Sequence, residues 1–168
     1  VVTIGGLSGK SGTYLNGSSK QTDNFTCTWT VGSANTNETF AGIINNWSCS
    51  GSGHTGTVSI VKTGTGLWRL KGNNDYKGTT RVNSGTLIVN GIHTGTGAIT
   101  VATGATLGGR GTLAGAVTIQ KEGVLLVGDT LASDHGLTFK GKVTLSAGAV
   151  LQLNDATMNV AKESGKDD

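Results

Sequence analysis

Carboxylate side chains are the groups with which this chain could carry out hydrolysis, because a glycosidase needs two carboxyl groups that face each other across the scissile bond. The sequence has 10 Asp and Glu residues among 168, and Glu122 and Asp129 are the pair that stands on neighbouring turns. We interpret both as exposed turn acids. No stretch repeats Asp as the calcium site of a polysaccharide lyase would require. The acids therefore predict a protein that is not an enzyme.

Histidines and glycines give no cofactor site. His54, His93 and His135 lie far apart, and none stands at metal-ligand spacing from a cysteine. We interpret them as surface-loop residues, although stacked coils could bring His93 and His135 together. The short glycine pairs lack the third glycine and the following helix of a dinucleotide fingerprint. We expect neither a metal nor a cofactor.

Aromatic residues in the first half of the chain are the candidates for ligand contact. Trp68, followed by Arg69 in an alternating stretch, is expected to face solvent, where its ring could stack on a sugar. Tyr76 and Asn74 belong to the turn-rich loop 72–78, which is too short for a known calcium loop. Trp68, Arg69, Asn74 and Tyr76 therefore form the predicted glycan-binding set.

Charge and cysteine content narrow the class of protein further. The net charge is +3, and the 13 Lys and Arg residues are scattered without aromatic interleaving, which argues against nucleic-acid binding. Cys27 and Cys49 each lie near a tryptophan, and they favour one disulfide worth about 3 kcal/mol in an oxidising compartment. Two buried free thiols are the alternative. The start on Val1, without Met or a signal peptide, predicts a fragment or a processed product.

The elements that position these residues follow from a repeat. Short stretches alternating Val, Ile and Leu with Thr are separated by turn glycines 19, 19 and 25 residues apart, namely Gly85, Gly104, Gly123 and Gly148. A period near 20 with two short strands per unit is typical of a solenoid, in which strands pair with their equivalents about 4.8 Å above and below. Each glycine is expected to supply a positive φ at a corner.

The prediction is an all-β parallel β-helix (β-solenoid) in three parts. Residues 1–57 are expected to form irregular, β-rich N-terminal coils that act as a cap, with Trp29, Trp47 and Phe40 closing the end of the apolar column. Residues 58–155 are expected to form the regular coils, and residues 156–168 a polar tail.

Four motifs of these regular coils carry a family resemblance. They are KTGTGL at 62–67, GNNDYKGTT at 72–80, VNSGTL at 82–87 and GATLGGRGT at 104–112. In their order they resemble the autotransporter-associated β-strand repeat of bacterial autotransporter passenger domains. The resemblance implies a right-handed β-helix on the outside of a bacterium, and it implies no residues that act on a substrate.

These observations favour a non-catalytic module of a secreted, surface-displayed bacterial protein, which serves as a rigid stalk and as an adhesion or glycan-contact surface. Its expected partners are extracellular polysaccharides or glycans and proteins of a host surface, with membrane attachment only through flanking regions. The alternative is an ancillary carbohydrate-binding module of a larger secreted polysaccharide-active enzyme.

Overall fold

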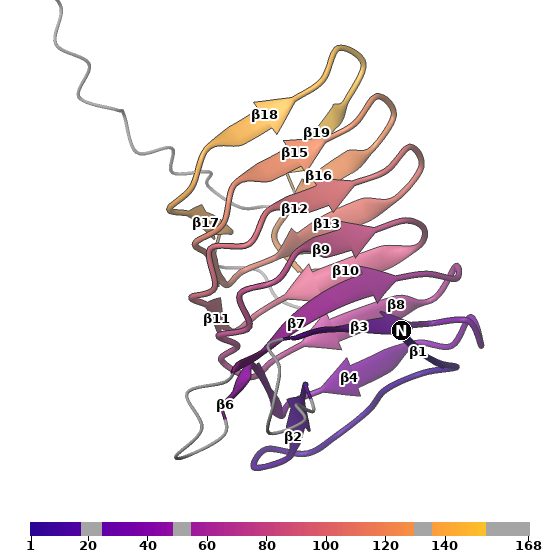
Figure 1. Ribbon diagram of the computed structural model, residues 1–168. Helices are drawn as coiled ribbons and strands as arrows, with labels where there is room; N and C mark the ends of the chain where they lie inside the picture. The colour runs from indigo at the N-terminus through magenta and orange to yellow at the C-terminus, as the bar shows by residue number, and fades with distance from the viewer. Residues whose placement is uncertain (18–24, 49–54, 130–135, 154–168) are drawn as a thin grey trace, which may run out of the picture.

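The computed structural model describes residues 1–17, 25–48, 55–129 and 136–153, which form 19 β-strands and no helix. Successive coils of the chain stack on one another from the indigo N-terminal end to the yellow C-terminal end (Figure 1). Each regular coil contributes one strand to each of three sheets. The predicted β-solenoid is therefore confirmed. A helical membrane span is absent from the described residues.

The first sheet runs the length of the stack. Its seven parallel strands are, in order, β1 (Val2–Ile4), β3 (Phe25–Val31), β7 (Thr55–Lys62), β9 (Thr80–Val82), β12 (Ile99–Val101), β15 (Val117–Ile119) and β18 (Val143–Leu145). A short strand, β6 (Trp47–Ser48), pairs antiparallel with β7. Because β1 and β3 belong to this sheet, the N-terminal coils continue the same ladder as the regular repeats.

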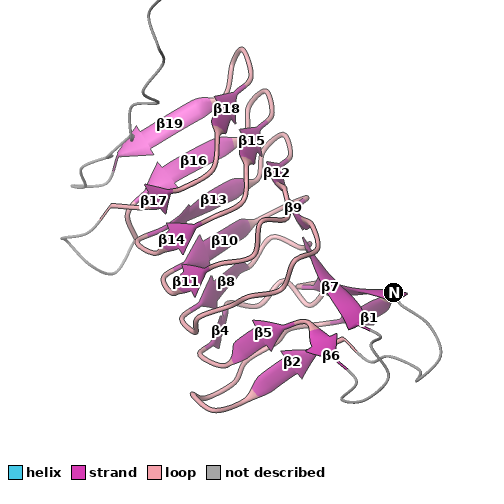
Figure 2. Cartoon of the chain, turned by 60° about the vertical axis from the view of Figure 1, so that its left-hand side comes forward, coloured by secondary structure: helices cyan, strands magenta, loops and turns pink. Residues whose placement is uncertain are grey.

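Two further sheets complete the coil. The second sheet is ordered β4 (Glu38–Phe40), β8 (Leu67–Leu70), β10 (Thr86–Val89), β13 (Thr106–Gly109), β16 (Val124–Val127) and β19 (Val150–Leu153). The third sheet contains β11 (Ile92–His93), β14 (Thr112–Leu113) and β17 (Thr138–Phe139), and β2 (Tyr14–Asn16) pairs with β5 (Ile43–Asn45) nearer the N-terminus. Figure 2 shows the third sheet along one side of the stack.

Columns of apolar side chains fill the interior. Leu87 pairs with Trp68 on one side and with Leu107 on the other, and all three are at most 1% exposed. In the first sheet, Ile99 and Val117 form an equivalent buried column. A strand of three or four residues cannot bury an apolar face alone, so cohesion comes from the stacking of neighbouring coils.

The corners follow the predicted glycine pattern with one exception. Gly85, Gly104 and Gly148 have φ angles of 64°, 72° and 83°, in the left-handed region that glycine tolerates best. At the third corner, however, it is Glu122 that has a positive φ of 61°, and not Gly123. The expectation for Gly123 is wrong, because the corner places its left-handed residue one position earlier.

Candidate functional site

All four residues predicted to bind a glycan are buried. Trp68 is 1% exposed, Asn74 and Tyr76 are each 2% exposed, and Arg69 is 9% exposed. The expectation that Trp68 faces solvent is wrong, since β8 directs Trp68 and Leu70 inward. A shift of one residue in a strand exchanges its two faces. The four side chains thus offer no exposed ring on which a sugar could stack.

Trp68 instead joins the N-terminal segment to the regular coils. Its indole Nε1 donates a hydrogen bond of 2.9 Å to the carbonyl oxygen of Leu7. Phe40 is 3% exposed, and Trp29 is half-buried and packs against the core. Trp29 and Phe40 thus pack at the N-terminal part of the core together with Trp68, and their role as a cap stays a prediction. The side chain of Trp47 does not belong to the described part of the structure.

Arg69 lies on the outer face of the second sheet, where Arg69 and Asn90 both bind the carboxylate of Asp129. The Arg69 guanidinium donates two hydrogen bonds of 3.0 Å to the Asp129 carboxylate, from Nε to Oδ2 and from Nη2 to Oδ1. Asn90 Nδ2 donates a third bond of 2.6 Å to Asp129 Oδ2. The expectation that Asp129 is an exposed turn acid is wrong, because its side chain is only 3% exposed. Glu122, in contrast, is exposed as expected.

The chain returns across the outer face just after β16, and this return explains the burial of Arg69. Gly128 and Gly109 exchange two backbone hydrogen bonds of 3.0 Å in an antiparallel bridge. On the same outer column, Ile88 is fully buried and Leu126 is 6% exposed, and neither belongs to the interior core. The longer interval of 25 residues in the sequence contains the connection between β16 and β17, of which residues 130–135 lie outside the described part of the chain.

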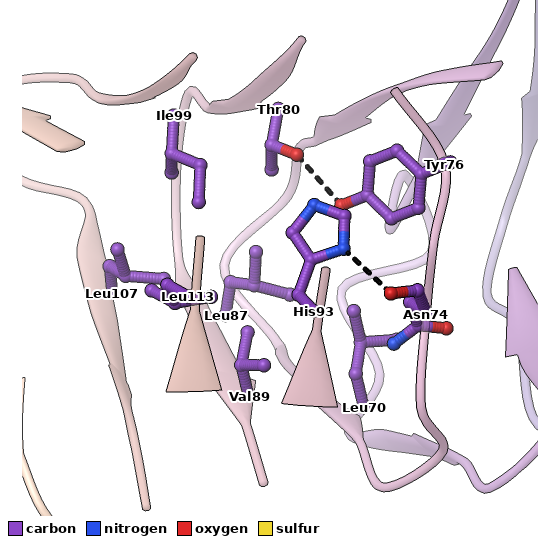
Figure 3. A pocket seen from close by; sticks show the side chains of 10 residues that line it. All are labelled: Leu70, Asn74, Tyr76, Thr80, Leu87, Val89, His93, Ile99, Leu107 and Leu113. Atoms are coloured by element: carbon purple, nitrogen blue, oxygen red, sulfur yellow. Dashed lines mark hydrogen bonds between the residues drawn. The ribbon is translucent and has the colours of Figure 1, made fainter. Parts of the chain in front are cut away.

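A second group of polar residues, which we call the polar cluster, lies inside the solenoid and consists of Asn74, Tyr76, Thr80 and His93 (Figure 3). The rings of Tyr76 and His93 stack with their centroids 4.2 Å apart. Tyr76 Oη and Thr80 Oγ1 share a hydrogen bond of 2.7 Å. Asn74 Oδ1 accepts a bond from the Ile44 amide, and Asn74 Nδ2 donates to the Gly72 carbonyl.

The burial of His93 was not anticipated. It is 2% exposed, so its interpretation as a surface-loop residue is wrong. Its backbone position is equivalent to that of Asn74 in the preceding coil and to that of Leu113 in the next coil. Because Leu113 points inward, aligning the repeats at Gly91 and Gly111 would have placed His93 inside as well.

Burial changes the acid–base behaviour of the polar cluster. It raises the pKa of Tyr76 to about 12, and the hydrogen bond with Thr80 opposes the change. Burial also lowers the pKa of His93 below 6.5, against the smaller opposing effects of the Asn74 carbonyl and the Asp75 charge. His93 is therefore held as a neutral imidazole near neutral pH.

Lys62, the first residue of the motif 62–67, is a buried cation, and its burial was not predicted from the sequence. It occupies an interior position between Val31 and Val82, and it is 1% exposed. Its ammonium group donates to the carbonyl oxygens of Thr63, Gly64 and Ser84 at 2.6, 3.0 and 3.3 Å. Burial lowers the pKa of the Lys62 side chain. The residue closes the corner after β7 and has no free face for a ligand.

The predicted disulfide is not found, and no metal site is present in the described part of the chain. Cys27 is a half-buried free cysteine, while Cys49 lies outside the described residues. His54 and His135 also lie outside them, so their relation to His93 stays a prediction. Within the described residues no three His, Cys, Asp or Glu side chains gather as metal ligands do.

Exposed basic side chains border the third sheet. Lys71 and Arg110 stand just after β8 and β13, at the corner that leads into this sheet. On its other border, three exposed lysines lie in the segments that lead from this side to the first sheet, namely Lys77, Lys140 and Lys142. Within the described part of this side, Asp75 is the one exposed acid. We call this surface the basic side of the solenoid.

Parts of the chain are similar to known autotransporter sequences. The family model described as passenger-associated-transport-repeat matches residues 60–89, which cover β8 to β10. A segment of 72 residues is 42% identical to the adhesin BmaC autotransporter of Brucella suis biovar 1 (strain 1330). This segment is 42% of the chain but only 2% of that protein. No solved structure matches the chain.

These matches confirm the resemblance to autotransporter-associated repeats. The repeat and the similarity to an autotransporter adhesin indicate a secreted, surface-displayed protein. The chain spans about 2% of the length of the curated relative it matches.

Proposed function

We propose that this chain is a non-catalytic section of a surface passenger, which extends the passenger as a rigid stalk and contacts anionic glycans along its basic side. The observation that carries the stalk role is the unbroken parallel pairing of the first sheet from β1 to β18. Each coil is fixed by backbone hydrogen bonds to both neighbours, so the stack resists bending and has no hinge between its described coils.

The described residues leave little space inside the solenoid at the polar cluster, and this supports a role without catalysis. The cavity at the polar cluster has a volume of about 10 Å³, which is the space of a single water molecule and excludes any sugar. Asp129 is buried against Arg69, whereas Glu122 is exposed before the other end of β16, and this arrangement does not favour a glycosidase pair.

The charge of the basic side favours an anionic partner. Equivalent positions in neighbouring coils are about 4.8 Å apart, so Lys71 and Arg110, two coils apart, are separated by about 10 Å along the axis. A row of cations at such intervals can meet the carboxylate or sulfate groups of an acidic polysaccharide, and attraction of this kind weakens with salt. The burial of Trp68 and Tyr76 removes the two rings predicted from the sequence to serve an ancillary carbohydrate-binding module.

Binding to immobilised polysaccharides tests the proposal. We expect retention on an acidic polysaccharide such as heparin, weaker retention as salt increases, and none on neutral dextran. The variant Lys77→Gln/Lys140→Gln should elute at lower salt. The matched control is Lys10→Gln/Lys121→Gln, which removes the same charge elsewhere and should elute with the unsubstituted chain. Equal weakening by both pairs would show that only net charge matters, and the proposed contact surface would then be rejected.

The absence of catalysis has its own test. Incubation with a panel of acidic and neutral polysaccharides should release no reducing ends and no unsaturated products. Turnover that disappears in Glu122→Gln would overturn the non-catalytic assignment.

A further inference from the structure

We infer that the polar cluster is a binding site for one buried water molecule, which links the imidazole of His93 to the hydroxyl pair of Tyr76 and Thr80. The inference is independent of the proposed function. It rests on the hydrogen-bonding capacity of three side chains that line one small cavity (Figure 3).

The tautomer of His93 follows from its contact with the backbone. Nδ1 lies 3.2 Å from the carbonyl oxygen of Asn74, and a carbonyl oxygen can only accept. Nδ1 must therefore carry the proton, and in a neutral imidazole Nε2 is then an acceptor. Nε2 is fully buried, and it has no hydrogen-bond partner among the described residues.

The hydroxyl pair has a donor to spare, whereas His93 has an acceptor to spare. Tyr76 Oη and Thr80 Oγ1 each carry one proton, but their mutual hydrogen bond uses only one of the two. Whichever hydroxyl donates, the other keeps a proton that has no acceptor in this bond. The cluster thus contains one donor and one acceptor that remain unused, and both belong to side chains around the same cavity.

A water molecule fits this arrangement in both size and capacity. The cavity volume of about 10 Å³ corresponds to one water molecule. Water can accept the remaining hydroxyl proton and donate one of its own to Nε2. An acceptor that is buried without a partner is unfavourable, and a bridging water restores its hydrogen bond at the cost of immobilising one molecule.

The remaining lining of the cavity makes the site specific for a small polar molecule. Leu87, Ile99, Leu107 and Leu113 are all at most 2% exposed and offer no polar atom. The charged groups nearest in sequence are the exposed side chains of Asp75 and Lys77. A bound ion would thus find no buried countercharge among these side chains.

A high-resolution crystal structure of the full chain, with NMR detection of long-lived water in solution, tests the site. We expect an ordered peak at about 2.6–3.2 Å from His93 Nε2 and from one hydroxyl of the pair. Magnetisation transfer should also occur between water and the ring protons of His93. A direct bond from either hydroxyl to Nε2, or well-ordered side chains with no peak between them, would overturn the inference.

Two variants separate the water site from a merely structural role. His93→Leu removes the acceptor, and leucine already stands at the equivalent interior position of the next coil as Leu113. Thr80→Val removes one hydroxyl, and valine stands in the same column as Val117. Both variants should lose the water signal while their circular dichroism stays β-rich. The control Thr100→Val changes a half-exposed threonine of the neighbouring strand and should keep the signal. Retention of the water in both cluster variants would reject the site.

Discussion

Arg69 and Asp129, sixty residues apart in sequence, meet as a bidentate ion pair on the outer face of the second sheet, with side chains only 10% and 3% exposed. The pair joins β8 to the segment after β16. It thereby holds Asp129 against the outer face of the second sheet.

Loss of Asp129 should be costly. In Asp129→Asn, Arg69 stays buried without a countercharge, and removal of one partner from a buried pair typically costs about 3–5 kcal/mol. We expect a loss of stability of that size in urea unfolding. Arg69→Leu/Asp129→Asn should recover part of it, because leucine suits the apolar outer column.

The exposed pair of Lys121 and Glu122 is a matched control, since its two charges are 3.8 Å apart and its side chains are 74% and 62% exposed. Lys121→Gln should change the free energy of unfolding by less than about 1 kcal/mol. Similar losses for Lys121→Gln and Asp129→Asn would contradict the special role of the buried pair.

Glu122 adopts a left-handed conformation with a φ of 61°, where a side chain costs about 1–2 kcal/mol. Glu122→Gly should therefore stabilise the chain by about 0.5–1 kcal/mol after the greater flexibility of the unfolded glycine is subtracted. Chemical denaturation would measure the difference.

The converse substitution is Gly104→Ala, at the equivalent position of the preceding corner. Gly104 has a φ of 72°, and no atom lies within 4 Å of the position that a Cβ would occupy, so backbone strain alone should destabilise this variant by about 1 kcal/mol. If the two substitutions changed stability in the same direction, φ would not be the determining factor.

Substitution of Trp68 distinguishes a structural residue from a glycan-binding one. Trp68→Ala removes a buried indole and its bond to Leu7, and such truncations cost about 3–5 kcal/mol. We expect a large loss of thermal stability and, below the new melting temperature, unchanged retention on an acidic polysaccharide. Weaker retention by a variant of normal stability would restore the surface interpretation.

Stability should depend on pH through His93. Because burial lowers the folded-state pKa of this residue below its unfolded value of 6.5, the unfolded chain binds the proton more readily. The contribution of His93 to stability is then fully present above about pH 6.5 and is lost as the pH falls from there through the folded-state pKa. Denaturation of the wild type and of His93→Leu at pH 8 and pH 5 would measure it. A wild-type loss no larger than that of His93→Leu would contradict the assignment.

Much of the fold could be predicted from the sequence because the repeat carries it. The positive φ angles of Gly85, Gly104 and Gly148 and the interior column of Leu87 and Leu107 follow from a period that every coil repeats. Local pattern decides such features, since each coil meets the same neighbours above and below.

The orientation of Trp68 was missed for a physical reason. The corner before β8 spans residues 63–66 and the corner before β10 spans 83–85, so Trp68, and not Leu67, is equivalent to Leu87. One extra corner residue exchanges the inward and outward faces of the strand. The motif at 62–67 does not show which of its residues is the extra one.

The sequence by itself determined the coil period, the parallel pairing and the apolar interior, because these depend on contacts between identical positions of successive repeats. Only the tertiary structure decided that Arg69 is covered by the segment bearing Asp129, and that His93 faces Tyr76 inside the solenoid. Those contacts join unlike residues, across sixty positions in the first case, and no repeating pattern encodes which polar side chain will find which partner.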